Sequence, residues 1–471
     1  MASLFSLHIF SKDSVQYSCV FLLSIFTAGL LVVIDSPFAD LAVFGGVCFL
    51  AISFARPMAG FIFYLFMIQH EQVVDLKVAN VMIINLMLAS VVLSTVFNSV
   101  SARSFTQLVL SIKKPLALCS CFIVTLLLVS LFNSTEKYSS VALYCFRMVS
   151  LLTLFYYFVD SRARLELALK VLLLSGVCMA LFGLFEVLIG RTFFYSAWTL
   201  GERYRFGIVR MGSTVGDPNY VCMALLPLIP LAHYFYSSAK TFIAKGYYLS
   251  ILAIFTLTIA LTFSRIGCLA LFFYGVYSLY AKYARGLETH YVIKKVLFLV
   301  VVSLLSVVLY FGYSLLTAKI SGAQISSTTR AIALELSYHF FKQFPLTGVG
   351  FDRLEYFNGS HLKTTLTASG GISSMNTYLK ILAEDGVFVF ISFFGLVAYA
   401  IRKLQKLGKT DPIYHYLNLG FISWLMVAVT LDSMGTAVFW IIIATVLRDY
   451  HEPATAALPP QHARVSLSAG R

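Results

Sequence analysis

Long apolar stretches recur along almost the whole chain. Within a lipid bilayer only a helix or a closed barrel satisfies every backbone polar group, and a spanning helix needs about 20 mainly apolar residues. Of the 471 residues, 59% are hydrophobic and 12% are charged, whereas a soluble domain has about 25% charged residues. The sequence therefore predicts an all-α, polytopic bundle of about 12–14 spans. The expected spans are 15–34, 38–55, 57–68, 78–97, 115–132, 139–159, 165–189, 220–236, 246–263, 266–281, 292–313, 376–401, 414–429 and 435–447.

The longest polar interruption is the segment 315–375. It is predicted to contain an amphipathic helix capped by Ser327 or Thr328, with Glu335, His339 and Gln343 on one face. The apolar face is expected to comprise Ile332, Leu336 and Phe340. A turn at Pro345 and Gly348-Val349-Gly350 then ends the helix. The expected organisation is an N-terminal transmembrane bundle (1–314), a large outer loop (315–375), C-terminal transmembrane helices (376–447) and a disordered cytoplasmic tail (448–471).

Positive charge is unevenly distributed between the loops. The net charge is +14, and most Lys and Arg residues lie in short loops that alternate along the chain, which predicts a cytoplasmic N-terminus. This distribution indicates membrane topology and not nucleic-acid binding. Two segments on the outer side, 191–217 and 315–375, also carry Lys and Arg residues, although positive charge is expected on the cytoplasmic side. Either long loops cross the membrane regardless of charge, or these bases hold an anion at the outer surface.

Two Arg-containing motifs precede the large loop. The first runs Arg210-Met-Gly-Ser-Thr-Val-Gly-Asp217-Pro-Asn219, where the glycines allow tight turns and Asp-Pro favours a helix start. The second is Ser264-Arg265-Ile-Gly, in the short connection between two spans. An Arg at the mouth of an outer cavity suits a phosphate group. The alternatives are an interfacial Arg that meets lipid headgroups at the first motif and a snorkelling Arg at the second.

Two further motifs belong to the loop and the helix that follows it. Arg330 is expected in the first turn of the loop helix, against the helix dipole, which suggests a ligand or a carboxylate partner. Asn376, Lys380 and Glu384 share one face at the start of the next span. This polar stripe is either functional or holds neighbouring helices together, with Lys380 and Glu384 as an internal ion pair. His339 and His361 are more typical of surface histidines than of catalysts.

Taken in order, the four motifs resemble those of the O-antigen ligase and O-antigen/exopolysaccharide polymerase family of bacterial membrane proteins. The matching positions are Arg210 with Pro218-Asn219, Ser264-Arg265-Ile266-Gly267, Arg330, Pro345 with Gly348-Val349-Gly350, and Asn376-Thr377-Tyr378-Leu379 with Glu384-Asp385-Gly386. One position departs from the family pattern: Met375 stands where the family has a His before the Asn. Methionine cannot accept a proton, which favours a polymerase over a ligase.

The resemblance implies an inner-membrane glycosyltransferase with a periplasmic active face. Its donor would be a glycan on undecaprenyl pyrophosphate, its acceptor a hydroxyl of the next lipid-linked repeat unit, and it would need no metal or other cofactor. Membrane lipids, a flippase and chain-length regulator proteins are the other implied partners. The expected catalytic residues are Arg210, Arg265, Arg330 and Glu384. The expected substrate-binding residues are Asp217, Asn219, Ser264, Asn376, Tyr378 and His339. The candidates for the general base are Asp217, Glu384, Asp385, Asp352, His339 and His361.

Three other functions remain open from the sequence. A ligase that joins the glycan to lipid A core or another acceptor would use the same chemistry. A transporter of lipid-linked sugars would also place charges within the bundle, but such proteins often contain inverted repeats, and the sequence has no evident internal repeat. A structural assembly subunit would not need outward-facing Arg residues beside a cavity.

Overall fold

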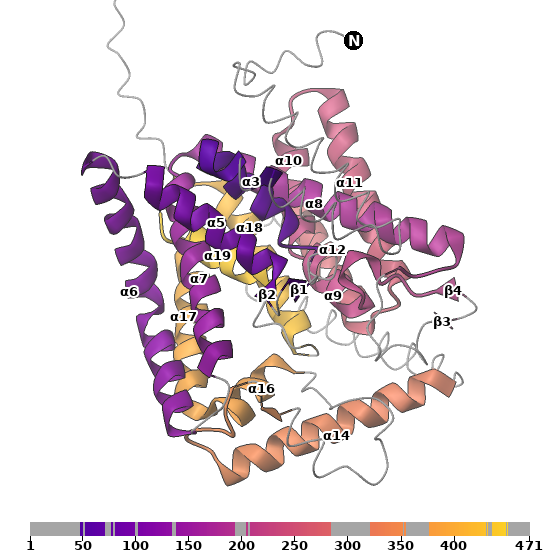
Figure 1. Cartoon of the computed structure of the whole chain (residues 1–471). Coiled ribbons are helices and arrows are strands. Elements are labelled where there is room, and N and C mark those ends of the chain that lie inside the picture. Colours follow the sequence, from indigo (N-terminus) through magenta and orange to yellow (C-terminus); the bar gives the residue numbers. More distant parts are fainter. Residues whose placement is uncertain are drawn as a thin grey trace, which may run out of the picture.

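The computed structural model shows a bundle of α-helices, and the predicted all-helical class is confirmed (Figure 1). The structure describes residues 48–49, 52–70, 77–78, 81–98, 102–133, 138–193, 204–205, 208–283, 321–351, 353–354, 376–429, 431, 436–448 and 450. These residues form fourteen α-helices, one 3-10 turn and two minimal hairpins with strands of two residues each.

The described elements are given in chain order. The first helices are α3 (Pro57–Met67), α5 (Ile83–Asn98), α6 (Ala102–Phe132), α7 (Tyr138–Phe158) and α8 (Arg162–Ile189). The middle of the chain forms η3 (Ser213–Val215), α9 (Pro218–Leu225), α10 (Leu228–Ser238), α11 (Phe242–Leu261) and α12 (Arg265–Tyr283). The last helices are α14 (Ser321–Gln343), α16 (Thr377–Glu384), α17 (Gly386–Leu407), α18 (Pro412–Ala428) and α19 (Ala437–Thr445). The antiparallel hairpins pair β1 (Lys77–Val78) with β2 (Val81–Met82) and β3 (Tyr204–Arg205) with β4 (Ile208–Val209).

Six described segments are long and apolar enough to cross a membrane, which makes this a multi-pass membrane protein. They are Pro115–Phe132, Tyr138–Phe158, Arg162–Ile189, Pro218–Ser238, Phe242–Leu261 and Gly386–Leu407. Shorter apolar helices occupy three more of the expected spans, at Pro57–Met67, Ile84–Phe97 and Arg265–Ser278. The expected spans 15–34 and 292–313, and most of 38–55, lie outside the described residues.

One expected span, 376–401, is wrong as a single helix. It is divided into α16 and α17 at Asp385. Gly386 has a φ of 75°, which an L side chain rarely adopts. The turn after α14 packs against this break, where Val387 N donates to the Pro345 carbonyl oxygen (2.9 Å). The split therefore depends on a partner segment remote in the chain, which hydropathy along one stretch does not reveal.

Asp-Pro pairs set the start of two helices. Asp217 caps α9 by accepting a hydrogen bond from Asn219 N (2.7 Å), and Asp411 caps α18 by accepting one from Ile413 N (3.0 Å). In both cases the proline that follows occupies the first helical position, where its missing N–H costs nothing. The Asp-Pro signal recognised at α9 therefore acts as predicted.

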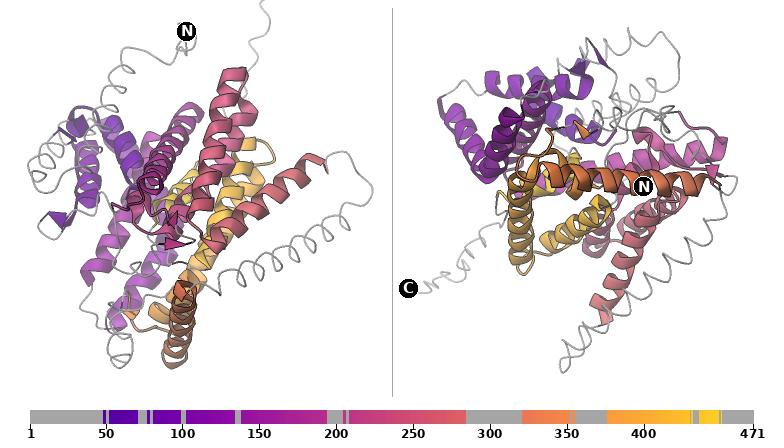
Figure 2. Two further views of the ribbon diagram at one scale, coloured as in Figure 1. Left: turned by 90° about the vertical axis from the view of Figure 1, so that its right-hand side faces the viewer. Right: turned by 90° about the horizontal axis from the view of Figure 1, so that it is seen from below.

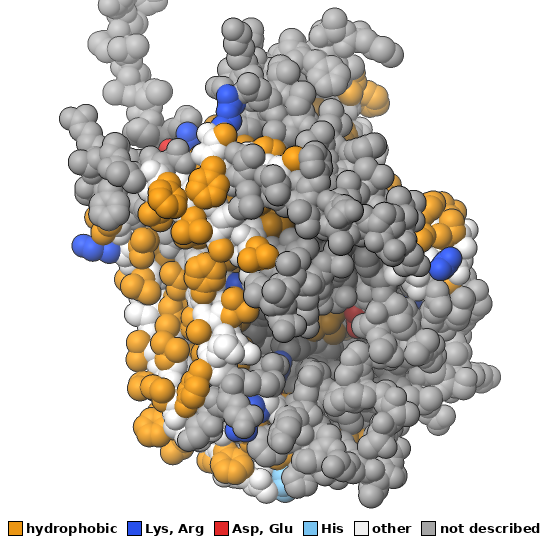
Figure 3. Space-filling view, viewed as in Figure 1, with side chains coloured by type: hydrophobic (Ala, Val, Ile, Leu, Met, Phe, Trp, Pro, Cys, Tyr) orange, Lys and Arg blue, Asp and Glu red, His pale blue; other side chains and the backbone are white. Residues whose placement is uncertain are grey.

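The outer surface of the bundle is apolar, and the interior is closely packed with aromatic rings. Large exposed hydrophobic side chains cover α6 and part of α7, and Figure 3 shows them as a continuous apolar face. A face of this extent on a helical bundle fits contact with lipid tails. Inside, Phe439 of α19 lies between Trp424 of α18 (ring centroids 4.5 Å apart) and Phe393 of α17 (5.5 Å).

The helix α14 lies across one end of the bundle and packs on α16 (Figures 1 and 2). It begins at Ser321 and not at the predicted cap, so Arg330 lies in the middle of the helix and not in its first turn. Its polar face is as predicted, since Glu335, His339 and Gln343 are exposed. Its buried residues are Ala333, Ser337 and Phe340, with Leu336 packed beside them, so the buried stripe differs slightly from the predicted one.

Candidate functional site

The structure joins the first two Arg motifs. Arg210 is 3% exposed, and its Nε donates a hydrogen bond to the carbonyl oxygen of Thr262 (3.1 Å). Beside it, Met211 N donates a hydrogen bond to the carbonyl oxygen of Leu261 (3.4 Å). The segment that follows β4 therefore lies against the end of α11. Two motifs that are separate in the sequence form one site.

Two residues of this site have a left-handed backbone without being glycine. Ser213 has a φ of 51° and Phe263 a φ of 52°. Such residues cost free energy and persist where the surrounding structure imposes them, which is frequently at functional sites. Ser213 lies three residues after Arg210, and Phe263 lies two residues before Arg265. Both Arg motifs thus contain a constrained turn.

Glu186 of α8 holds the turn at Ser213. Its carboxylate is fully buried and accepts hydrogen bonds from Ser213 N (2.6 Å) and Phe193 N (2.9 Å). The Ser213 hydroxyl donates to the carbonyl oxygen of Met179 (2.6 Å). The sequence analysis missed Glu186. The available signal was an acidic residue inside an apolar span, which is costly unless it has partners and a role.

Replacing Glu186 with Gln is expected to loosen this turn. A Gln amide offers one acceptor oxygen and a donor NH₂ group, so one of the two backbone N–H donors loses its acceptor. A buried donor without a partner costs about 1–3 kcal/mol. We expect a lower apparent melting temperature in detergent and reduced activity, measured against Glu335→Gln on the exposed face of α14. Equal melting and activity of Glu186→Gln and the wild type would contradict this role.

Beside this turn, the first turn of α12 contacts Cys222 in the second turn of α9. A Cβ atom at Gly267 would lie 2.5 Å from Cys222 Sγ, so the glycine permits α12 to approach α9 directly. Arg265 is the first residue of α12 and is partly exposed, and no described residue pairs with its guanidinium. Ser264 Oγ is buried and has no hydrogen-bond partner among the described residues. Asn219 lies in the first turn of α9, partly exposed.

This arrangement favours an anion electrostatically. Helix N-termini carry positive partial charge and backbone N–H groups without partners in the helix. Here the N-terminus of α12 carries Arg265 and contacts α9 at Cys222, and Arg210 is bonded to the nearby Thr262. The expected site residues Arg210, Asp217, Asn219, Ser264 and Arg265 therefore belong to one group, which we call the arginine site.

The other expected site residues form a second group at the junction of α14, α16 and α17. The turn after α14 is bonded to the end of α16, since Val349 N donates to Ala383 O (2.9 Å) and Gly350 N to Glu384 O (2.7 Å). Glu384 is 1% exposed, its Oε1 accepts from Leu354 N (3.1 Å), and its Oε2 lies 3.8 Å from Lys380 Nζ. The internal ion pair considered for this polar stripe is therefore present.

The remaining members of the second group also make structural contacts. Asn376 caps α16 by accepting from Tyr378 N (2.9 Å) and Leu379 N (3.0 Å). The Tyr378 hydroxyl donates to Leu425 O of α18 (2.7 Å). His339 is exposed and lies 2.9 Å from the Gln343 amide through its Nε2. The side chain of Arg330 and the residues Asp352, His361 and Met375 lie outside the described part of the structure.

A buried histidine just after the end of α3 supports the arginine site. His70 follows this helix and is 5% exposed. Ser175 Oγ donates to Phe66 O (2.7 Å), so it accepts from His70 Nε2 (3.1 Å). His70 Nδ1 must then accept from the Thr214 hydroxyl (2.9 Å), because a neutral imidazole has one donor and one acceptor. Burial lowers the pKa of His70 to about 4, which keeps the ring neutral near pH 7.

This histidine is expected to make stability depend on pH. Its pKa is lower in the folded protein than its usual value of about 6.5, so below pH 6.5 the unfolded chain binds the extra proton. Stability is therefore lost as the pH falls from about 6.5 towards 4, by about 2 kcal/mol between pH 7 and pH 5. His70→Gln, which does not titrate, should flatten the pH dependence of the melting temperature, whereas His339→Gln should keep it. The same slope in all three proteins would contradict this assignment.

The described residues contain no group of three or more His, Cys, Asp or Glu side chains that could hold a metal ion. The fold is that of a polytopic helical membrane protein, and the arginine site is chemically suited to an anionic group.

Residues 250–394 match the family model described as O-antigen ligase. This segment is therefore similar to that family of membrane glycan-transferring enzymes, and the resemblance drawn from the motifs is confirmed. Arg265 and the second group lie within the matched residues, whereas Arg210 and Asp217 precede them. A comparison with curated proteins finds no match.

Proposed function

We propose that this protein is a polymerase that joins oligosaccharide repeat units linked to undecaprenyl pyrophosphate into O-antigen or exopolysaccharide. The observation that supports the proposal is the arginine site, where Arg265 begins α12 against α9 and Arg210 is bonded to Thr262, an arrangement of cations that suits a pyrophosphate group. Met375, in place of the family's His, favours a polymerase over a ligase.

The reaction is a substitution at the anomeric carbon of the donor. The acceptor hydroxyl oxygen forms the new glycosidic bond, the bond from this carbon to the pyrophosphate oxygen breaks, and undecaprenyl pyrophosphate leaves with the electron pair. Arg265 stabilises the growing negative charge on the leaving group, because a fixed guanidinium needs no reorganisation at the moment of reaction. Arg210, bonded to Thr262 O, shapes the site and adds positive charge, and Arg330 is the third candidate contact.

Asp217 is our candidate for the general base that accepts the hydroxyl proton. Among the carboxylates at these sites, Glu186, Glu384 and Asp385 are almost fully buried. Asp217 is partly exposed and adjoins Asn219 in the arginine site. Glu384 is then a positioning residue that fixes the segment after α14, which covers the end of the bundle.

The variant Asp217→Asn separates catalysis from folding. Asn is as good a helix cap as Asp, so α9 should still form, but the amide cannot accept the proton. General-base catalysis contributes about 10²–10⁴-fold, and we expect a loss of rate of that order with little change in melting temperature. Asp411→Asn, at the cap of α18, is the matched control and should retain activity. Normal turnover by Asp217→Asn would remove Asp217 as the base.

The proposed site of action is the periplasmic face of the bacterial inner membrane. The charge rule places α14 and the N-termini of α9 and α12 on that side, where lipid-linked repeat units would be available for joining. A flippase that supplies these units and a chain-length regulator are the proposed protein partners.

The polysaccharide profile of cells lacking the protein tests this function. For a polymerase, long chains disappear while single repeat units remain attached to their final carrier. For a ligase, the runner-up, attached glycan disappears and long chains accumulate on the lipid carrier. If lipid-linked repeat units instead accumulate on the cytoplasmic side of the membrane, the protein is a transporter. Complementation with the wild-type protein is the control for each profile.

A further inference from the structure

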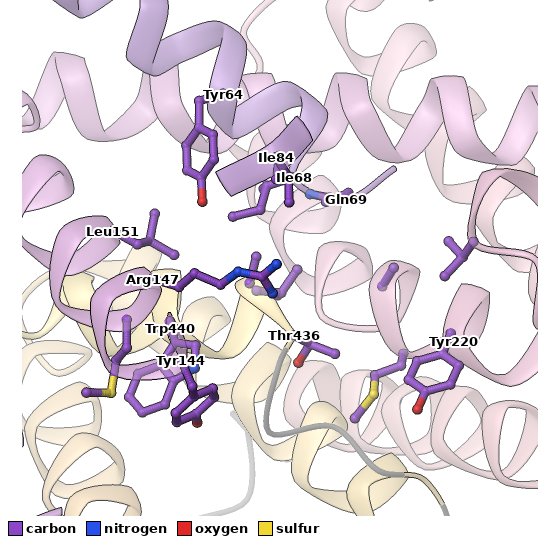
Figure 4. A pocket seen from close by; sticks show the side chains of 16 residues that line it. Tyr64, Ile68, Gln69, Ile84, Tyr144, Arg147, Leu151, Tyr220, Thr436 and Trp440 are labelled. Carbon is purple, nitrogen blue, oxygen red and sulfur yellow. The ribbon is translucent and has the colours of Figure 1, made fainter. Parts of the chain in front are cut away.

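A pocket opens between helices beside η3. It encloses about 920 Å³ of space between atoms, part of it open to solvent, and Figure 4 shows the side chains around it. Its lining comes from α3, α5, α7, η3, α9 and α19, and from the residues that directly follow α3 and precede α19. The sequence analysis singled out none of the residues that line it.

Arg147 supplies the positive charge of this pocket. Its guanidinium extends from α7 towards the middle of the lining side chains (Figure 4). Its Nε donates to the side-chain oxygen of Asn85, a neutral partner. Arg147 is the only charged residue that lines the pocket among the described residues. A guanidinium carries five N–H donors, so it can bind hydroxyl, carbonyl or carboxylate oxygens of a ligand.

Gln69 offers a hydrogen-bond acceptor that complements the N–H donors of Arg147. It is 6% exposed and lines the pocket. Its Nε2 donates to Leu172 O (3.4 Å), which leaves Oε1 as the acceptor, and Oε1 has no hydrogen-bond partner among the described residues. A buried polar atom without a partner needs an explanation. A ligand that donates a hydrogen bond, such as a hydroxyl group, provides it.

Aromatic side chains form much of the remaining wall. They are Tyr64, Tyr144, Tyr220 and Trp440. A sugar ring has C–H faces that pack on aromatic rings and a rim of hydroxyl groups that both donate and accept hydrogen bonds. The pocket has the matching features: rings for the faces, Gln69 Oε1 for a donor and Arg147 for an acceptor. An acyl chain would leave Gln69 Oε1 without a hydrogen-bond donor.

The pocket adjoins the arginine site. Val215, the last residue of η3, and Tyr220, in the first turn of α9, both line it. These two residues flank Asp217 and Asn219 in the chain. A sugar in the pocket would therefore lie beside the proposed pyrophosphate position, as one end of a sugar–pyrophosphate substrate requires.

We propose that this pocket is a subsite for a sugar ring of the lipid-linked glycan, with Arg147 and Gln69 as its hydrogen-bonding residues. The assignment rests on the proposed function and adds a position for the carbohydrate to that of the pyrophosphate.

Two separate binding measurements test the subsite, with the protein in lipid nanodiscs. The first probe is the oligosaccharide repeat unit released by mild acid from the lipid-linked intermediate of cells that make this protein. The second is undecaprenyl pyrophosphate without sugar. We expect Gln69→Met and Arg147→Gln to weaken oligosaccharide binding about tenfold or more, and to change binding of the second probe less than about twofold. Arg265→Ala should show the reverse pattern.

Matched variants show whether weaker binding reflects the pocket itself or a loss of folded protein. Arg164→Gln, an exposed Arg paired with Asp160 outside the pocket, should bind both probes like the wild type. Arg147→Lys keeps the charge and should bind the oligosaccharide more tightly than Arg147→Gln. Melting temperatures identify any variant that does not fold, and Gln69→Met removes no charge from the bundle.

The outcomes separate the subsite from the proposed function. The subsite is overturned if the wild type does not bind the oligosaccharide, or if folded Gln69→Met and Arg147→Gln bind it as the wild type does. In either case the arginine site still stands if Arg265→Ala no longer binds undecaprenyl pyrophosphate. If Arg265→Ala binds undecaprenyl pyrophosphate normally while the pocket variants lose the oligosaccharide, the pyrophosphate position is wrong and the sugar subsite stands.

Discussion

Replacing Arg265 with Ala is expected to lower the rate of glycan polymerisation by about 10²–10³-fold. Arg265 begins α12, whose first turn contacts α9, and its guanidinium has no partner among the described residues. The substitution thus removes positive charge from the leaving-group position without breaking a described contact. The measurement is chain growth from purified lipid-linked repeat units in proteoliposomes.

The size of the effect should depend on geometry as well as charge. Arg265→Lys retains the charge but loses the planar, two-pronged donor that fits phosphate oxygens, so its rate should fall between those of Arg265→Ala and the wild type. Arg164→Ala, far from the arginine site in the sequence and exposed, is the control that should keep the wild-type rate. Polymer growth by Arg265→Ala at the wild-type rate would refute the proposed role of this residue in stabilising the leaving group.

Gly386→Ala is expected to disrupt the junction between α14, α16 and α17. Gly386 has a φ of 75°, and a Cβ atom there would lie 2.2 Å from the carbonyl oxygen of Leu346. Gly348, in the turn after α14, has a φ of 62°, and a Cβ atom there would likewise lie 2.2 Å from the carbonyl oxygen of Glu384. Because both obstacles are backbone atoms, the added methyl group cannot be accommodated by a side-chain movement. The backbone itself must shift.

We expect Gly386→Ala and Gly348→Ala to destabilise the protein by more than about 3 kcal/mol, since they combine an unfavourable φ with a steric clash. The measurements are the yield of folded protein in detergent and its melting temperature. Gly395→Ala, within α17, is the control, because a Cβ atom there meets nothing within 4 Å. It should be neutral or stabilising by up to about 1 kcal/mol. Equal yield and melting of Gly386→Ala and Gly395→Ala would show that the junction tolerates a rearranged turn.

The motif residues could be found from the sequence because their types are unusual in an apolar chain. Arg265 between two spans, Arg210 in a glycine-rich turn and the Asp217-Pro218 helix start each stand out against the hydrophobic background. Glu186, His70, Gln69 and Arg147 were missed. Glu186 and Arg147 are single polar residues within apolar runs, and Gln69 and His70 directly follow such a run. The role of each depends on which other element lies opposite.

The sequence by itself determined the class of structure. Its long apolar runs require helices in a membrane, because lipid offers no other partner for backbone N–H and C=O groups, and its motifs indicated the family and the candidate arginines. Only the tertiary structure decided which motifs meet: Arg210 with Thr262 beside Arg265 in one group, and the turn after α14 with the break at Gly386 in another. It also placed Arg147 and Gln69 at one pocket. The physical reason is that hydropathy and turn signals are local, whereas the partner of a buried polar group lies on a different helix that packing alone selects.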